Sequence, residues 1–148
     1  MKLNGAEREK WVALLMGVKF FADFSYEELG SLLDAGEVRH YKIHDFVIKE
    51  NEETETSTFF VILRGSVKVL KNDHFHQKKE LVTIQAGDCF GEMAFLLNAP
   101  RTASILAVED SYIFRVSSKA ADSMNDPSRV KLYRQFAISL AERLSRTG

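Results

Sequence analysis

The chain has 148 residues, of which 45% are hydrophobic and 28% charged, a balance typical of one globular domain and not of a disordered or fibrous protein. Its 20 basic residues are matched by 21 acidic ones, without a dense Lys/Arg block, which argues against direct binding of nucleic acid. The apolar region over residues 11–24 is too short and too charged for a bilayer span, and the single cysteine, Cys89, suits a reducing compartment, so we expect a cytoplasmic protein without a membrane partner.

Two helices are predicted at the start of the chain. The first carries an apolar stripe at helical spacing, formed by Trp11, Leu14, Leu15 and Val18. Ser25 and Glu28 can form a capping box for the second helix, and Gly36 can end it. Residues 1–36 are therefore expected to be helical.

From residue 37 the pattern changes to short runs rich in Val, Ile, Phe and Tyr, which are separated by polar turn residues. The runs are EVRHY, FVI, TFFVILR, SVKVLK, ELVTI, ASILAV and SYIFRV. No long helix lies between them, so the strands must pair mostly antiparallel, because parallel crossovers usually need a helix. We predict an antiparallel, jelly-roll-like β-roll over residues 37–116.

The strand pattern stops after the roll, and residues 117–148 are predicted to form closing helices. Asp126 can cap the last helix, with Pro127 at its first position. An apolar stripe follows along this helix, formed by Tyr133, Phe136, Ala137, Leu140 and Leu144. The expected fold class is α+β, a roll flanked by terminal helices in a single domain over residues 1–148.

Residues 87–104, GDCFGEMAFLLNAPRTAS, contain groups suited to binding a cyclic phosphate on a ribose. Gly91 has no Cβ, so the backbone can come close to a ligand, and Glu92 can accept a hydrogen bond from a ribose hydroxyl. A single helical turn can start near Met93, with free N–H groups directed at an anion. The N–H of Ala94 is the predicted phosphate donor.

Arg101 supplies a cation for the phosphate. Pro100 stiffens the approach to it, and a planar guanidinium can hold two phosphate oxygens at once. The Gly-Glu-x-Ala turn followed by Pro-Arg-x-Ala-Ser resembles the phosphate-binding cassette of the cyclic-nucleotide-binding domain family. The matching positions are Gly91, Glu92, Ala94, Pro100, Arg101 and Ala103.

The resemblance covers nearly the whole chain, since FFADFSYEEL resembles the family's first helices and FFVILRGSVKV its core hairpin, with Gly65 at the turn. It implies a receptor for cyclic AMP or cyclic GMP that is not an enzyme and needs no other cofactor. The implied ligand-binding residues are Gly91, Glu92, Met93, Ala94, Arg101, Thr102 and Ala103. Thr102 resembles a position of cyclic-GMP-preferring kinase domains, but domains of mixed preference carry it too, so the base preference stays open.

In the family the last helix closes over the base and reports occupancy to an attached effector. Tyr133, Phe136 and Leu140 could take this role here, although ordinary packing of the stripe against the roll is the alternative. The apolar face of the first helix could pair with a second chain, so the expected partner is another protein or a homodimer. Two features depart from the family pattern: His44 replaces a common turn glycine, and residues 50–57 replace a glycine-containing turn.

Three other functions are alternatives to this one. His74, His76 and Glu80 partly resemble the first metal motif of cupins, but no histidine follows His76 and Lys68 replaces the motif's leading glycine. Many bacterial relatives are transcription regulators with a helix-turn-helix after the last helix, and the chain ends before such a segment. A scaffold that keeps the cassette's shape without binding a ligand is the remaining alternative.

Overall fold

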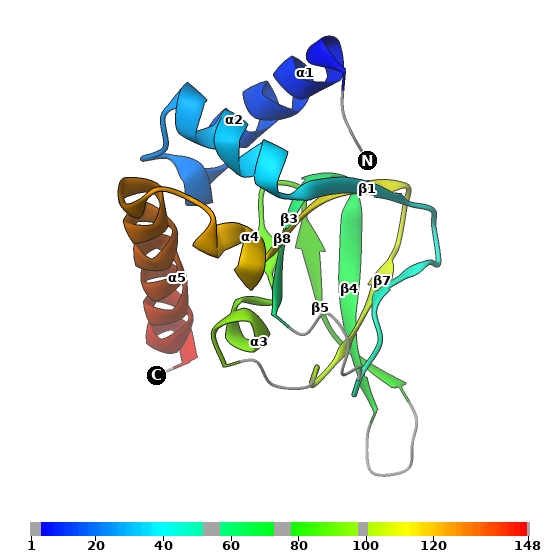
Figure 1. Ribbon diagram of the computed structural model, residues 1–148. Coiled ribbons are helices and arrows are strands. Elements are labelled where there is room, and N and C mark those ends of the chain that lie inside the picture. Colours follow the sequence, from blue (N-terminus) through cyan, green and yellow to red (C-terminus); the bar gives the residue numbers. More distant parts are fainter. Residues whose placement is uncertain (1–3, 52–56, 73–77, 98–100, 148) are drawn as a thin grey trace.

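The computed structural model describes residues 4–51, 57–72, 78–97 and 101–147, and it confirms the predicted α+β class. Within these residues, eight strands form two four-stranded sheets, with the orders β1-β8-β3-β6 and β2-β7-β4-β5. Every strand pair is antiparallel. Helices α1, α2, α4 and α5 gather on one side of this roll (Figure 1).

The strands follow the predicted runs closely. They are β1 (Glu37–Tyr41), β2 (Phe46–Ile48), β3 (Thr58–Arg64), β4 (Ser66–Asn72), β5 (Lys78–Gln85), β6 (Cys89–Phe90), β7 (Ser104–Ala107) and β8 (Ser111–Ser117). Strand β6 was not predicted, because two residues are too short to show a periodic pattern. It pairs with β3 and leads directly to Gly91.

The N-terminal segment forms α1 (Gly5–Met16), the 3-10 turn η1 (Lys19–Phe21) and α2 (Tyr26–Ala35). Gly17 caps α1, so the helix ends before Val18, which is nevertheless buried. The predicted capping box of α2 is confirmed.

After the cassette helix α3 (Glu92–Leu97), the chain ends in α4 (Ser118–Asp122) and α5 (Asp126–Thr147). The predicted capping role of Asp126 is wrong: Asn125 Oδ1 accepts a hydrogen bond of 2.9 Å from Ser128 N, so the cap lies one residue earlier. Asp126 instead pairs with Arg129 within the first turn. None of the described helices is both long and apolar enough to cross a membrane.

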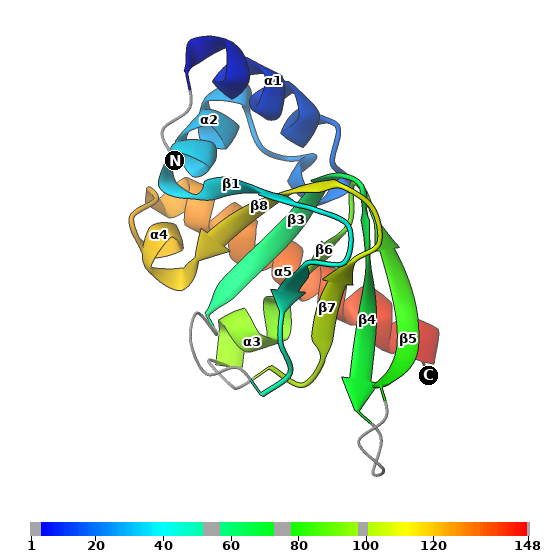
Figure 2. The same ribbon diagram turned by 90° about the vertical axis from the view of Figure 1, so that its right-hand side faces the viewer.

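Two apolar clusters lie on opposite faces of the β1-β8-β3-β6 sheet. Phe59, Val61 and Phe114 point outward into a cluster with the helices. Phe60 and Ile62 point inward and pack inside the roll. Figure 2 shows the four strands side by side, with α5 crossing behind them. The alternation of side chains along each strand therefore gives the sheet a helix-covered face and an inner face.

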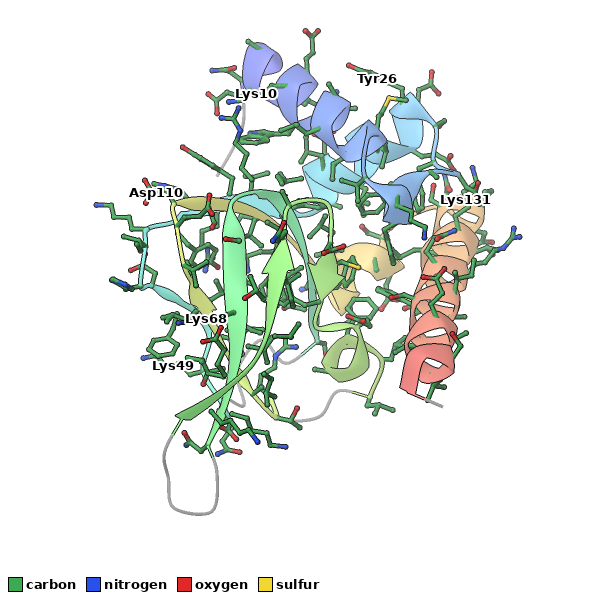
Figure 3. All side chains as sticks on the ribbon, turned by 180° about the vertical axis from the view of Figure 1, so that it is seen from behind. Lys10, Tyr26, Lys49, Lys68, Asp110 and Lys131 are labelled. Carbon is green, nitrogen blue, oxygen red and sulfur yellow. The ribbon has the colours of Figure 1, made fainter. Side chains whose placement is uncertain are left out.

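Helix α5 is tied to α2 by a polar contact. Lys131 Nζ lies 2.6 Å from Glu28 Oε1, and Ser128 Oγ donates a hydrogen bond of 3.2 Å to Glu28 Oε2. Lys131 lies near the start of α5, on the side of α2 (Figure 3). Burial raises the pKa of Glu28, but hydrogen bonds from Lys131 and Ser25 outweigh this effect and lower it to about 2.

Candidate functional site

Within the predicted cassette of residues 87–104, the candidate binding residues begin at Gly91, directly after β6. Gly91 has a φ of +87°, in the left-handed region that favours glycine. A Cβ at this position would lie 3.0 Å from Thr58 O, 3.1 Å from a ring carbon of Phe60 and 3.2 Å from Arg101 Nη1. The structure thus brings Gly91 and Arg101 together, and the missing side chain is what permits this approach.

Arg101 is only 5% exposed and lies against β3. Its Nη2 donates a hydrogen bond of 2.9 Å to Thr58 O, and its guanidinium carbon lies 5.5 Å from the centroid of the Phe60 ring. The backbone is held as well, since Asn51 N donates to Arg101 O at 2.8 Å. The guanidinium is thus buried and fixed by Thr58 O and the Phe60 ring. A phosphate oxyanion requires a cation held in place in this way.

Glu92 is 1% exposed and is the first residue of α3. Phe95 N donates to Gly91 O at 3.0 Å, which closes the first turn of this helix. The N–H groups of Met93 and Ala94 lie in that first turn, where a helix offers them no acceptor of its own. The turn expected from the sequence is therefore present, with the carboxylate of Glu92 at its start.

The remaining predicted contacts flank Arg101. Thr102 is exposed and Ala103 is half-buried. The next residue, Ser104, is buried, and its Oγ accepts a hydrogen bond of 2.9 Å from Glu50 N. Pro100 lies outside the described residues.

The three predicted lid residues of α5 have different surroundings. Phe136 is 1% exposed, and its ring lies 4.7 Å from that of Phe59 and 5.0 Å from that of Phe95. Tyr133 is exposed, with its ring 6.2 Å from that of Phe95, and Leu140 is half-buried. Phe136 therefore packs in the core in this structure, and α5 reaches the cassette helix through Phe95.

A second buried arginine, Arg115, was not singled out from the sequence. It is 8% exposed, and its guanidinium carbon lies 5.4 Å from the centroid of the Phe60 ring. Arg115 Nη1 is 3.7 Å from Glu37 Oε1. The run SYIFRV contained the clue, because alternation along a strand places Arg115 and Ile113 on the same inward face.

Of the three residues that resemble a cupin metal motif, the structure describes only Glu80. His74 and His76 lie outside the described residues, and Glu80 lies 3.6 Å from Lys68 Nζ in an ion pair. In the parts of the chain that the structure describes, no three His, Cys, Asp or Glu side chains lie close enough together to hold a metal ion.

The sequence is similar to parts of cyclic-nucleotide-dependent kinase proteins, as two relatives show. The chain is 34% identical to cGMP-dependent protein kinase 2 of Homo sapiens over 106 residues, which are 71% of this chain and 14% of the kinase. It is 35% identical to the cAMP-dependent protein kinase regulatory subunit of Mycosarcoma maydis over 108 residues, 72% of this chain and 20% of that protein. The chain therefore spans a fifth or less of these curated relatives.

Solved structures share the fold. A cyclic nucleotide-binding domain from Methylobacillus flagellatus KT superposes with a TM-score of 0.80 at 23% identity, over 95% of this chain and 80% of that one. The catabolite activator protein of Thermus thermophilus gives a TM-score of 0.76 at 22% identity, over 86% of this chain and 59% of that one. The model of the cyclic nucleotide-binding domain family matches residues 38–125, more than half of the chain. The chain thus belongs to the cyclic nucleotide-binding domain family.

Proposed function

We propose that this domain is a receptor for a cyclic mononucleotide, cyclic AMP or cyclic GMP, and that its binding site lies in the cassette, between Gly91 and Ala103. The observation that carries the proposal is the position of Arg101, a buried cation directly beside the Cβ-free backbone of Gly91. Glu92, buried at the start of the adjoining helix, supplies an acceptor next to it. A cation and an acceptor beside backbone that carries no side chain suit a sugar phosphate.

Each residue has a distinct part in this proposal. Arg101 neutralises the cyclic phosphate and exchanges its hydrogen bond to Thr58 O for bonds to phosphate oxygens. The carboxylate of Glu92 accepts a hydrogen bond from the ribose 2′-hydroxyl. The N–H of Ala94, in the first turn of α3, donates to the phosphate. Low exposure of both charged groups strengthens these interactions relative to water.

The remaining residues bear on the base. Met93 and Ala103 complete the binding set, and the exposed hydroxyl of Thr102 is available to a guanine. The similarity to a cGMP-dependent kinase supports cyclic GMP, and the similarity to a cAMP-dependent kinase subunit supports cyclic AMP. Comparing both ligands on a Thr102→Ala variant would decide whether this hydroxyl selects the base.

We further propose that the terminal helices transmit occupancy. Tyr133 and Leu140, which are not fully buried, are the lid residues open to a base, while Phe136 anchors α5 to the core. A change at α3 would reach α5 through the Phe95 contacts. In this proposal the receptor is cytoplasmic and passes its output to a protein partner or a second copy, not to nucleic acid or a membrane.

The test is calorimetric titration of nucleotide-stripped protein with cyclic AMP, cyclic GMP and a linear mononucleotide. Arg101→Ala should weaken binding roughly tenfold to over a hundredfold, because it removes a charge-assisted contact worth about 1.5 to 3 kcal/mol. Glu92→Gln keeps the shape and should weaken binding less. Arg64→Ala, which removes an exposed arginine of β3, is the matched control and should bind normally.

Unchanged affinity in Arg101→Ala would contradict the assignment, and a larger loss in Glu92→Gln would reverse the two roles. Equal binding of the linear mononucleotide would mean that the cyclic phosphate is not recognised. Absence of binding to any of the three would favour a scaffold that has lost its ligand.

A further inference from the structure

A polar pocket lies beside the cassette, at one end of the inner face of the β1-β8-β3-β6 sheet. It has a volume of about 250 Å³. The lining residues that matter here are Gly36, Glu37, Arg39, Thr58, Arg115 and Ser117. None of these was predicted from the sequence to bind a ligand, and we call this cavity the Arg115 pocket.

Strand register explains why the pocket and the cassette are neighbours. Glu37 pairs with Arg115 across β1 and β8, Arg115 pairs with Phe60 across β8 and β3, and Phe60 pairs with Phe90 across β3 and β6. The ring of Phe60 contacts both buried guanidinium groups, at 5.4 Å for Arg115 and 5.5 Å for Arg101. The Arg115 pocket and the cassette therefore adjoin each other, with the ring of Phe60 between their two arginines.

The charges of the pocket are arranged around one carboxylate. Glu37 Oε1 accepts a hydrogen bond of 2.8 Å from Arg39 Nε and lies 3.7 Å from Arg115 Nη1. Arg39 Nη2 also lies 2.6 Å from Glu37 Oε1, so this one carboxylate holds both guanidinium groups in place, each with its five N–H donors in a planar fork. Among the lining residues that the structure describes, two are cationic and one is anionic, and Thr58 and Ser117 add hydroxyl groups.

We propose that the Arg115 pocket binds a small oxyanion the size of phosphate, separately from the cassette. Oriented guanidinium groups and hydroxyls are the donors that tetrahedral oxyanions accept from, and the low exposure of Arg115 strengthens such contacts. At about 250 Å³ the pocket falls below the range of roughly 300 to 1,000 Å³ typical of sites for drug-sized ligands, which favours a small ion over a nucleotide.

The experiment is a titration of the 148-residue chain with inorganic phosphate in chloride buffer, followed by the Nε–H resonances of the arginines in NMR spectra. The wild type should show saturable shifts at Arg115 and Arg39. Arg115→Gln should weaken phosphate binding about tenfold or more, because it removes a charge-assisted contact. The surface control Arg64→Gln should retain wild-type affinity. Sulfate should compete with phosphate for the Arg115 pocket. A saturating concentration of cyclic nucleotide should leave phosphate bound there.

The opposite pattern, with phosphate binding lost in Arg101→Gln and kept in Arg115→Gln, would overturn the proposal, because the ion would then occupy the cassette. Absence of saturable shifts in the wild type would overturn it as well. If a thermal melt shows that Arg115→Gln is unfolded, Arg39→Gln replaces it, since Arg39 is exposed at the rim, and the same weakening is expected. Cyclic nucleotide titrations of these variants separate a failure of this site from a failure of the proposed receptor function.

Discussion

The two faces of the β1-β8-β3-β6 sheet differ in what they bury. The outer face packs Phe59, Val61 and Phe114 against the helices in a cluster of apolar side chains. The inner face is also apolar in its middle, but towards the cassette it lies against two buried arginines, Arg101 and Arg115. Their guanidinium groups both contact the ring of Phe60. Buried charges contribute little to stability by themselves, whereas buried aromatic rings contribute much. In the proposed receptor, stability and recognition are thus separated between the two faces of one sheet.

The largest effect is expected from breaking the outer face. Phe136→Ala should lower the free energy of unfolding by about 3 to 5 kcal/mol, because it leaves a cavity among the rings of Phe20, Phe59 and Phe95. Leu144→Ala, on the same helix but 72% exposed, should change it by less than about 0.5 kcal/mol. Urea denaturation measures both, and similar losses in the two variants would contradict the packing described for α5.

Two glycines with a positive φ test the close approach beside Arg101. Gly91→Ala should destabilise the fold by about 2 to 3 kcal/mol, since it combines a positive φ with a Cβ only 3.0 Å from Thr58 O. Gly87→Ala is the matched control, with a φ of +92° and nothing within 4 Å of the added Cβ, and should cost about 1 to 2 kcal/mol. Urea denaturation of both variants gives the difference in unfolding free energy that is due to the close contact at Gly91. Equal losses in the two variants would show that an added Cβ at Gly91 meets no tight contact.

A smaller effect concerns the contact between α2 and α5. The pKa of Glu28 is lowered from 4.5 to about 2, so its stabilising contribution is complete above pH 4.5 and is lost as the pH falls towards 2. Glu28→Gln should therefore cost about 1 to 2 kcal/mol at pH 7 and flatten the dependence of stability on pH below 4.5. Glu27→Gln, which changes an exposed neighbour, should keep the wild-type slope, and an unchanged slope in Glu28→Gln would contradict the ion pair.

The smallest effect is a gain. His44 adopts a φ of +74°. Its backbone N–H donates a hydrogen bond of 2.8 Å to Ala107 O, and this bond holds the residue in the left-handed conformation. His44→Gly should stabilise the protein by roughly 0.5 to 1 kcal/mol, because relief of the left-handed strain exceeds the entropy that glycine loses on folding. A thermal melt would reveal this gain, and a lower melting temperature would show that the imidazole makes a contribution beyond the turn.

Much of this organisation could be predicted from the sequence, because it depends on local patterns. Alternation and capping signals predicted the roll and the capping box of α2, and the spacing of the cassette placed Gly91 and Arg101 in one region. The departure at His44 was visible as well, although its positive φ was not. The cap of α5 was missed by one residue, since Asn125 and Asp126 are both good capping residues.

Long-range partners could not be predicted. Arg101 donates to the carbonyl of Thr58, 43 residues away, and a backbone carbonyl has no signature in a sequence. The contact of Arg115 with Phe60 depends on the register of β8 against β3, which neither strand specifies alone. The sequence could not show which of Phe136 and Tyr133 is buried for a similar reason, since both belong to one stripe and only the packing of α5 decides it.

The most direct test of the central claim is a crystal structure of the domain with the cyclic nucleotide that it binds more tightly. We predict the cyclic phosphate between Gly91, the first turn of α3 and Arg101, with the ribose hydroxyl on Glu92 and the Arg101 hydrogen bond to Thr58 O exchanged for the phosphate. A nucleotide found elsewhere, or one that occupies the cassette while Arg101 keeps its bond to Thr58 O, would contradict this account.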